Sequence, residues 1–304
     1  MSSAHRLFAI FGVHVLHSLS PQLFNAAFVS MGIDARYLRI RPTHAGQIAS
    51  IMRSMPLVGA NITTPFKAEV MPHLGWIAPE AKAIGGVNVV VNDGGELLGY
   101  NTDCIGAAHS LAEAGCDLGR RRCLVLGAGP AAAAAAYGLR AAGAEVYVAN
   151  RTHVRAVEMA DRLGCSAVRV AELSGLLPQV DVVVSALQAD VNMLSGSELR
   201  PEQWVLDANY KRSPLLAQAQ ARGCRVVSGR RWLLHQALPA MERFCGGRPS
   251  MEALEAALEQ RLDYNKLVIG PLKDDAALRA DLLVADAANI NAIADEEKRS
   301  AIGG

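Results

Sequence analysis

The chain has 304 residues, of which 51% are hydrophobic and 19% charged, and its formal net charge is +1. This is an ordinary globular composition, long enough for about two domains. Because the net charge is close to zero, the sequence gives no electrostatic reason to expect nucleic acid or an anionic membrane as a partner, and we expect a small molecule instead. The 6 cysteines are scattered, without C-x-x-C or zinc-site spacing, which favours reduced thiols in a cytoplasmic protein.

The first residues, MSSAHRLFAIFGVHVLHSLSP, have the outline of a secretory signal, a basic residue followed by an apolar run. The run lacks a small-x-small cleavage site, and His14 and His17 interrupt it, so we predict a buried first strand. No apolar stretch approaches the roughly 18 residues that a membrane-spanning helix needs. We therefore expect a cytoplasmic protein with no membrane partner.

Strand and helix patterns alternate along the first third of the chain. Period-2 apolar runs predict strands, and apolar residues at helical spacing predict helices. The predicted strands cover 7–12, 34–40 and 59–63, and the predicted helices cover 21–32 and 45–55. Residues 86–102 hold two more strands around an Asn-Asp-Gly-Gly turn, which is typical of a hairpin.

The middle of the chain is more regular. Short apolar runs rich in β-branched residues alternate with helical segments, which predicts a parallel sheet with helices on both faces. These runs cover residues 121–127, 144–150, 166–170, 181–187, 204–209 and 224–229.

Two further helices are predicted over 230–246 and 249–262, and we expect them to pack back on the first domain. The predicted fold class is α/β with two domains. A discontinuous α/β substrate-binding domain covers 1–104 plus 238–264, and an inserted Rossmann-like domain with a parallel sheet covers 105–237. The sequence assigns no role to a C-terminal extension, 265–304.

The segment GANITTPFKAEV predicts a strand, a turn and a helix start. Thr64 can cap the helix and Pro65 suits its first position, which places Lys67 in the first turn. An ammonium there faces the positive end of the helix dipole, at a cost of some tenths of a kcal/mol. Taken alone, Lys67 is better explained as a surface lysine that tolerates this position at almost no cost.

The segment CLVLGAGPAAAAAAYGL has the order strand, G-x-G-x-x-A, helix. Small residues let the backbone approach a pyrophosphate, which then lies on a helix N-terminus. The glycine pattern alone is a weak signal, but strand and helix flank it in the required order. We therefore predict a dinucleotide-binding loop formed by Gly127, Ala128, Gly129, Pro130 and Ala131.

The next strand ends about twenty residues later, where the ribose is selected. An NAD-binding protein usually carries an acid there, but this chain has NRTHVR. Arg151 and Arg155 can donate to a 2′-phosphate, and Asn150 and Thr152 can add neutral donors. The alternative is a solvated basic helix start. With the glycine loop upstream, the combination predicts NADP.

Several polar residues could bind a substrate. In the motif HSLSP, Ser18 and Ser20 lie two residues apart, so in an extended backbone both hydroxyls face the same way and could bind a carboxylate. Ser20 could equally be only a helix cap, and so could Asp103. Asn88 and Asp103 lie at strand ends, while Gln236 lies on a helix and could simply be exposed.

In order, the segments HSLSP, NITTPFK, GGVNVV, GYNTD, GAGPAA, NRT, DANY…SPLL and SGRRWLLHQA resemble the shikimate dehydrogenase family. The resemblance runs from about Phe8 to about Leu262 and rests on order and approximate spacing, not on one motif. It implies an enzyme, an NADP-dependent oxidoreductase acting on a CH–OH group. The implied reaction is hydride transfer between 3-dehydroshikimate and shikimate, in the chorismate and aromatic amino acid pathway.

Matched position by position, the resemblance implies that Lys67 and Asp103 form the catalytic pair. Ketone reduction puts negative charge on an oxygen and needs a proton, so a lysine directed at that oxygen can stabilise the charge and transfer the proton. Ser18 and Ser20 would hold the substrate carboxylate. The other implied contacts are to substrate from Thr63, Asn88, Tyr210 and Gln236, and to cofactor from Gly229.

The chain also departs from the family pattern. Pro130 takes the fourth place of G-A-G-G, Cys104 stands where Gly is common, and Ser185-Ala186-Leu187 replaces Asn-Ala-Thr. Two alternatives therefore stay open. One is a paralogue acting on quinate, aminoshikimate or another carboxylated cyclitol, and the other is a non-catalytic binding or regulatory protein. The presence of both Lys67 and Asp103 argues against the second, and a homodimer is possible in every case.

Overall fold

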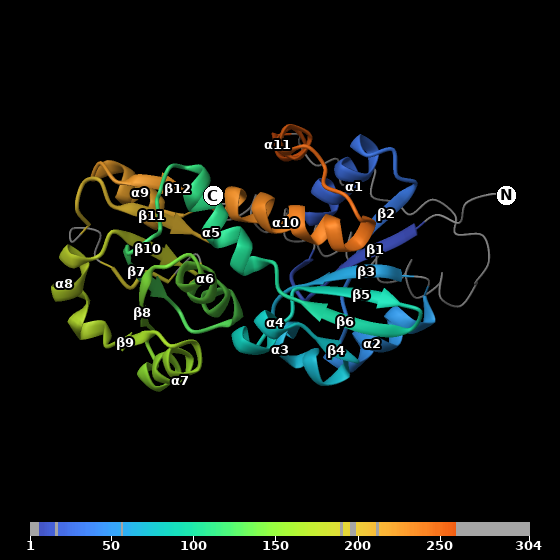
Figure 1. Ribbon diagram of the computed structural model, residues 1–304, viewed down its shortest axis with the longest axis horizontal. Helices are drawn as coiled ribbons and strands as arrows, with labels where there is room; N and C mark the ends of the chain where they lie inside the picture. The colour runs from blue at the N-terminus through green and yellow to red at the C-terminus, as the bar shows by residue number, and fades with distance from the viewer. Residues whose placement is uncertain are drawn as a thin grey trace, which may run out of the picture. The chain divides into compact units, whose positions relative to one another are not determined.

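The computed structural model describes residues 6–15, 18–55, 57–188, 191–194, 199–210 and 213–259. It has two six-stranded sheets with helices around them, so the predicted α/β fold class is confirmed (Figure 1). The predicted extension, 265–304, lies outside the described residues.

The chain divides into two compact units. The first holds residues up to His73, Val91–Gly95 and the residues from Pro249 on, and the second holds Leu74–Val90 and Glu96–Arg248. The first unit is thus discontinuous along the sequence. The domain limits predicted from the sequence, at residues 104 and 237, differ from these units and stay a prediction.

The first sheet has the strand order β2-β1-β3-β5-β6-β4. Its strands are β1 (Arg6–Phe11), β2 (Ala35–Ile40), β3 (Leu57–Ile62), β4 (Trp76–Ile77), β5 (Val89–Asp93) and β6 (Glu96–Tyr100). β1 pairs in parallel with β2 and β3, so the carboxyl ends of these three strands meet at one edge. The predicted strands and hairpin are confirmed; β4 was not predicted, because two residues carry no periodic pattern.

Four helices accompany this part of the chain: α1 (Ser20–Ser30), α2 (Ala45–Ser54), α3 (Phe66–Glu69) and α4 (Pro79–Ile84), with a 3-10 turn at Met71–His73. α1 buries Phe24 and Phe28, and the Phe28 ring lies 5.0 Å from the ring of Phe8 on β1. The last described helix, α11 (Met251–Glu259), packs on α1, where the side-chain amide of Gln22 donates to the carbonyl of Ala257. The predicted packing of this helix on the first domain is therefore confirmed, whereas the other predicted helix, α10 (Gly229–Cys245), packs on α5 (Asp103–Glu113) within the second unit.

The second sheet has the order β12-β11-β10-β7-β8-β9, and every pair in it is parallel. Its strands are β7 (Arg122–Leu126), β8 (Glu145–Ala149), β9 (Ser166–Val168), β10 (Val182–Ser185), β11 (Trp204–Asp207) and β12 (Arg225–Val227). All six were predicted. The order reverses between β7 and β10, and at such a point a doubly wound sheet leaves a crevice at the carboxyl ends of its strands.

Helices cover both faces of this sheet. They are α5 (Asp103–Glu113), α6 (Pro130–Ala141), α7 (His153–Leu163), α8 (Leu173–Leu176), α9 (Pro214–Ala221) and α10 (Gly229–Cys245), with 3-10 turns at Val170–Glu172 and Leu177–Gln179. Val125 and Val184 point into one core with α5, α6 and α7, whereas Leu124 and Val183 point into another with α8 and α9. Because neighbouring residues of one strand face opposite cores, the runs are apolar throughout, as expected of a buried parallel sheet.

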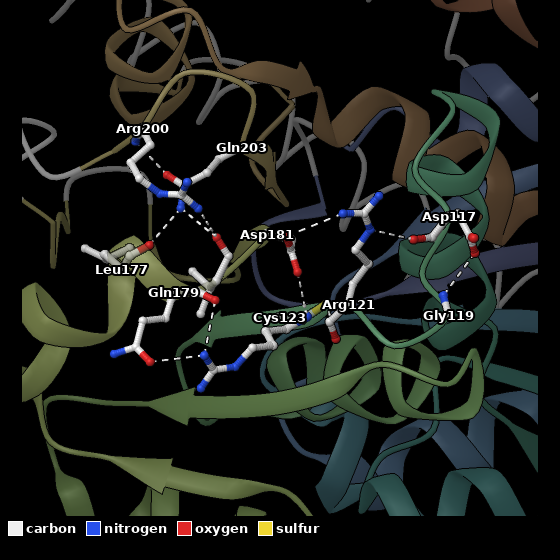
Figure 2. A network of polar contacts seen from close by, with 11 residues as sticks. Asp117, Gly119, Arg121, Cys123, Leu177, Gln179, Asp181, Arg200 and Gln203 are labelled. Carbon is white, nitrogen blue, oxygen red and sulfur yellow. Dashed lines mark hydrogen bonds and ion pairs between the residues drawn. The ribbon is translucent and has the colours of Figure 1, made fainter.

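Side-chain hydrogen bonds hold together the amino-terminal edge of this sheet (Figure 2). Asp181, just before β10, receives a hydrogen bond from the main-chain N–H of Arg122 at 3.0 Å and lies 3.4 Å from the Arg121 guanidinium. The buried amide of Gln203, just before β11, donates to the carbonyls of Leu177 and Val180, each at 2.8 Å. These bonds satisfy polar groups where the strands begin and leave the carboxyl edge to the loops of the candidate site.

α5 lies unusually close to two other helices. A Cβ at Gly138 of α6 would be 2.1 Å from the carbonyl oxygen of Cys104, and a Cβ at Gly106 of α5 would be 2.7 Å from the Trp232 ring of α10. Only glycine fits either contact. Within the described residues, no helix is long and apolar enough to cross a membrane.

We predict that Gly138→Ala destabilises the protein by roughly 1–3 kcal/mol or more, because the added methyl meets main-chain atoms that cannot rotate away. Gly175→Ala is the matched control, since a Cβ there meets nothing within 4 Å and alanine favours a helix. Urea unfolding of both variants measures the difference, and an unchanged midpoint for Gly138→Ala would contradict the close approach of α5 and α6.

Candidate active site

The segment after β3 carries Thr63 and Lys67. The Thr64–Pro65 peptide bond is cis, and α3 covers only Phe66–Glu69. The predicted helix start was wrong in detail: Pro65, not Thr64, is at the N-cap position, and no side chain caps the helix. In a helix of four residues, Lys67 belongs to the last turn as well as the first, so the expected dipole effect on its ammonium does not apply.

Thr63 lies where β3 and β1 end side by side. Its N–H donates to the carbonyl of Phe11 at 2.8 Å. A Cβ at Gly12 would lie 2.3 Å from the methyl carbon of Thr63, so the chain after β1 passes close against Thr63 because residue 12 is glycine. Thr63 and Lys67 thus come after β3 at the same edge of the sheet from which the loop after β1 leaves.

Ser18 and Ser20 come from that loop, and both are buried. The Ser18 hydroxyl accepts a hydrogen bond from the N–H of Ser20 at 3.2 Å. The interpretation of Ser20 as a cap is wrong, because Leu19 occupies the N-cap position and no side-chain cap bond forms. Arg39 of β2 holds the loop by donating to the carbonyls of Val15 at 3.1 Å and Ser18 at 2.9 Å.

Asn88, Thr102, Asp103 and Gln236 form one buried hydrogen-bonded cluster. The amide nitrogen of Asn88 donates to Asp103 Oδ1 at 2.9 Å and to the Thr102 hydroxyl at 3.0 Å, and it lies 3.4 Å from Gln236 Oε1. An amide has only two N–H bonds, so the contact with Gln236 is the weakest of the three. The N–H of Thr102 donates to Asn88 Oδ1 at 2.7 Å, which fixes the orientation of the Asn88 amide.

The cluster settles two alternatives left by the sequence. Gln236 is 6% exposed, so it is not an exposed polar residue, and its amide nitrogen donates to the Leu233 carbonyl at 2.9 Å. Asp103 is not the N-cap of α5: Thr102 occupies that position, and Asp103 is the first residue of the helix. Its carboxylate therefore remains available to the cluster at a helix end that favours negative charge.

The close packing of α5 and α10 positions the cluster. At Gly106 a Cβ would come 2.9 Å from the Cβ of Gln236, and the Trp232 indole N–H donates to the main-chain carbonyl of Asp103 at 2.9 Å. Cys104 is buried behind Asp103, and burial, with the Asp103 charge second, raises the pKa of its thiol to about 12. The thiol is therefore uncharged at neutral pH and acts as packing.

The predicted dinucleotide loop joins β7 to α6. Gly127 has φ of 113°, a left-handed conformation that favours glycine, and its N–H donates to the Ala149 carbonyl at the end of β8 at 2.8 Å. Gly129 is the N-cap of α6, with open space around its Cα. Pro130 begins the twelve-residue helix as predicted and removes one N–H from it; Ala128 and Ala131 are only partly buried.

The basic residues after β8 lie around the start of α7. Asn150 donates to the Thr152 carbonyl at 3.0 Å, Thr152 is the N-cap, and Arg155 is in the first turn. Arg151 precedes the helix, so the two arginines are not an i, i+4 pair of one helix. Both are exposed, and neither guanidinium has a hydrogen bond or ion pair within the described part of the chain. Two unpaired guanidiniums at the positive end of a helix suit an anion.

Tyr210 follows β11, whereas Gly229 follows β12 and begins α10. A Cβ at Gly229 would be 2.5 Å from the Ala208 carbonyl oxygen, so close packing alone explains this glycine. Tyr210 is partly buried, beside Asn209, which bonds Asp207 and the Leu187 carbonyl. Their predicted contacts with cofactor and substrate stay predictions.

Sequence reasoning did not assign two residues of this region. The Thr102 hydroxyl accepts a hydrogen bond from the Asn88 amide and lies 3.4 Å from Gln236 Oε1. In the sequence, only its position in the motif GYNTD indicated that it belongs to this cluster. Arg39 lies in a strand without any motif around it, and its two carbonyl bonds depend on tertiary structure. No local pattern could have indicated it.

Comparison with known proteins agrees with this architecture. Residues 10–90 match the model of the shikimate dehydrogenase substrate binding domain, and residues 108–205 match that of shikimate / quinate 5-dehydrogenase. The shikimate dehydrogenase (NADP(+)) of Moorella thermoacetica is 36% identical over 275 residues, 84% of this chain and 93% of the relative.

Two solved structures are similar throughout. The shikimate dehydrogenase of Aquifex aeolicus has a TM-score of 0.81 and 29% identity, covering 86% of this chain and 100% of that one. The shikimate 5-dehydrogenase of Thermus thermophilus, in complex with NADP(H) and shikimate, has a TM-score of 0.76 and 33% identity, covering 83% and 98%. With an identity above 30% across most of both chains, the chain belongs to the shikimate dehydrogenase family of oxidoreductases.

Proposed function

We propose that the protein is an NADP-dependent shikimate dehydrogenase that reversibly reduces 3-dehydroshikimate to shikimate. The observation that carries the proposal is the buried cluster of Asn88, Thr102, Asp103 and Gln236, in which amides, a hydroxyl and a carboxylate are already oriented. A ring with several hydroxyl groups needs such fixed donors and acceptors. Burial strengthens them, because water competes little there.

The residues present fit the cofactor. Gly127 turns the backbone, the open space at Gly129 leaves the start of α6 accessible to a pyrophosphate, and Arg151 and Arg155 supply two unpaired charges for a 2′-phosphate. Asn150 and Thr152 can add neutral donors. When bound, NADPH supplies the hydride in the reducing direction, and NADP accepts it in the other.

The substrate would be oriented by the serines of the loop after β1 and by polar residues that follow other strands or lie on α10. Ser18 and Ser20, in the buried loop that Arg39 holds, would bind the carboxylate with their hydroxyls. Thr63, Asn88 and Gln236 would bind ring hydroxyls, and Tyr210 would add a contact beyond β11. Neutral donors would thus bind the hydroxyl groups of the substrate, and serine hydroxyls its one charged group.

Lys67 and Asp103 would do the proton chemistry. In reduction, the ammonium of Lys67 gives a proton to the carbonyl oxygen as the hydride reaches the carbon, so the C=O bond becomes CH–OH and the amine is left neutral. The Asp103 carboxylate would orient the ammonium and stabilise its charge, while the Asn88 amide holds Oδ1 of Asp103 in place. Oxidation of shikimate is the same step reversed.

The direct test follows NADPH absorbance with purified protein. Shikimate and quinate are each offered with NADP and with NAD, and 3-dehydroshikimate is offered with NADPH. We expect turnover with shikimate and NADP, and with 3-dehydroshikimate and NADPH. Absence of turnover with all of these, in a folded sample, would reject the proposed function.

One alternative is favoured by a specific observation, because the matched family model is described as shikimate / quinate 5-dehydrogenase. Faster turnover of quinate in the same assay would select it, with Lys67 and Asp103 in the same roles. Binding of shikimate without turnover would instead select a non-catalytic binding protein. A homodimer and a cytoplasmic location stay predictions.

We predict that Lys67→Ala lowers turnover by about 10²–10³-fold and changes the KM for shikimate much less. The lost transition-state interaction is on the order of 3–4 kcal/mol. Lys82→Ala is the control, because Lys82 is an exposed lysine of α4 outside the proposed site. Steady-state kinetics measure both variants, and near-normal turnover of Lys67→Ala would remove Lys67 from the mechanism.

We also predict a preference for NADP over NAD on the order of 10²-fold. Arg151 and Arg155 would each form a charge-assisted hydrogen bond with the 2′-phosphate, and because both are exposed, each bond should contribute an energy near the low end of the usual range. Replacing Arg151 and Arg155 together by Ala should abolish the preference by weakening NADP while leaving NAD nearly unchanged. The exposed Arg222→Ala serves as the control for loss of positive charge. Equal efficiency with both cofactors in the unmodified protein would contradict the assignment.

A further inference from the structure

Arg162, in the last turn of α7, forms hydrogen bonds with the end of α4. Its Nε donates to the carbonyl of Ala83 at 3.0 Å, and its Nη2 donates to the carbonyl of Ile84 at 3.2 Å. The last carbonyls of a helix have no partner within the helix, so a guanidinium with parallel N–H groups suits them. Arg162 thus ties the two helices together.

The two residues whose carbonyls Arg162 binds shortly precede Asn88, which is proposed to bind the substrate. α4 ends at Ile84, its C-cap is Gly85 with φ of 73°, and the chain then runs through Gly86 and Val87 to Asn88. The side chain of Asn101 donates to the Gly86 carbonyl at 2.8 Å, and the N–H of Asn88 donates to the Tyr100 carbonyl at 3.0 Å. The segment is therefore held from the β6 side at Gly86 and Asn88, and from the α7 side by Arg162.

Two glycines, Gly85 and Gly86, lie between the end of α4 and Asn88. The N–H groups of Gly85 and Gly86 both donate to the Ala81 carbonyl, at 2.9 and 3.1 Å, so the segment that leads to Asn88 is attached to the end of α4 that Arg162 holds. The Asn88 amide must keep its orientation to bond Thr102 and Asp103 at once. Without the hydrogen bonds of Arg162, the end of α4 and the segment after it could shift, because no covalent bond holds them in place.

The geometry points to Arg162 as a positioning residue for the substrate site: by holding the end of α4, it sets the orientation of Asn88. This inference rests on the proposed function of Asn88. It also gives α7 two roles, since the same helix starts at the arginines proposed for the 2′-phosphate and ends at Arg162. Arg155 and Arg162 are seven residues apart in this helix, which is a rise of about 10 Å.

The experiment is a double-mutant cycle of Arg162→Ala and Asn88→Ala, measured as kcat and KM for shikimate with saturating NADP. Arg162→Ala should raise the KM about five- to tenfold with a smaller change in kcat, the scale expected for two partly exposed hydrogen bonds. Arg162→Lys should restore part of the loss, because an ammonium can still donate to one carbonyl. The double variant should be no worse than Asn88→Ala, because Arg162 acts through Asn88.

Arg140→Ala is the matched control. Arg140 is likewise an exposed arginine in the last turn of its helix, α6, and its side chain lies against Gly164 at the end of α7, but it makes no hydrogen bond to α4 among the described residues. Thermal unfolding of every variant shows whether it is folded under assay conditions. A KM for Arg162→Ala equal to that of Arg140→Ala, or additive effects in the cycle, would overturn the inference.

A second measurement, which does not depend on enzymatic turnover, tests the positioning role of Arg162 separately from the proposed function. Amide hydrogen exchange at Gly86, Val87 and Asn88 should be faster in Arg162→Ala than in the unmodified protein and unchanged in Arg140→Ala. If the unmodified protein turns over none of the acids, the proposed function fails while the exchange result still decides the positioning role. Unchanged exchange at these three amides would reject it.

Discussion

The absence of side chains at Gly106 and Gly138 is the constraint on which the candidate site depends. Gly138 lets α6 touch the main chain of α5 at Cys104, and Gly106 lets α10 place Trp232 and Gln236 against the same helix. α6 begins at the nucleotide loop, α5 begins at Asp103, and α10 carries Gln236. Two glycines thus bring a proposed cofactor loop, a proposed catalytic acid and a proposed substrate amide into fixed relation within one unit.

Charge is distributed differently in the two kinds of site. The Asp103 carboxylate is buried, receives a hydrogen bond from Asn88, and lies in the first turn of an eleven-residue helix. Arg151 and Arg155 are exposed at a helix start with no acidic residue in its first turn. A buried, bonded carboxylate suits a proton-transfer role that must stay in one place, whereas exposed cations without partners suit a ligand that arrives from solvent.

The sequence predicted the fold well because its signals are local. The six strands of the second sheet, the hairpin around Gly94 and Gly95, and the nucleotide turn at Gly127 all follow from apolar runs and glycine positions. The errors arose where structure depends on distant contacts. The segment around Pro65 predicted the start of a helix with Lys67 in its first turn, but α3 is only four residues long and stops at Glu69. For Gln236, an exposed position stayed open beside the implied substrate contact, because nothing local shows that Gly106 of another helix lets it be buried. Arg39 and Arg162 act through carbonyls far away in sequence, and such bonds leave no motif.

The choice between shikimate and quinate depends on one end of the site. The two acids share their ring hydroxyls but differ at the carbon that bears the carboxylate, which is unsaturated in one and carries an extra hydroxyl in the other. In the proposed arrangement, the cluster around Asn88 would bind the shared hydroxyls and would not separate the two acids. Discrimination would then come from the loop of Ser18 and Ser20, where an added hydroxyl would need a partner or be left unpaired on burial. That loop is held by Arg39 through two main-chain carbonyls, so its shape is set by a residue of β2 that is not proposed to touch the substrate.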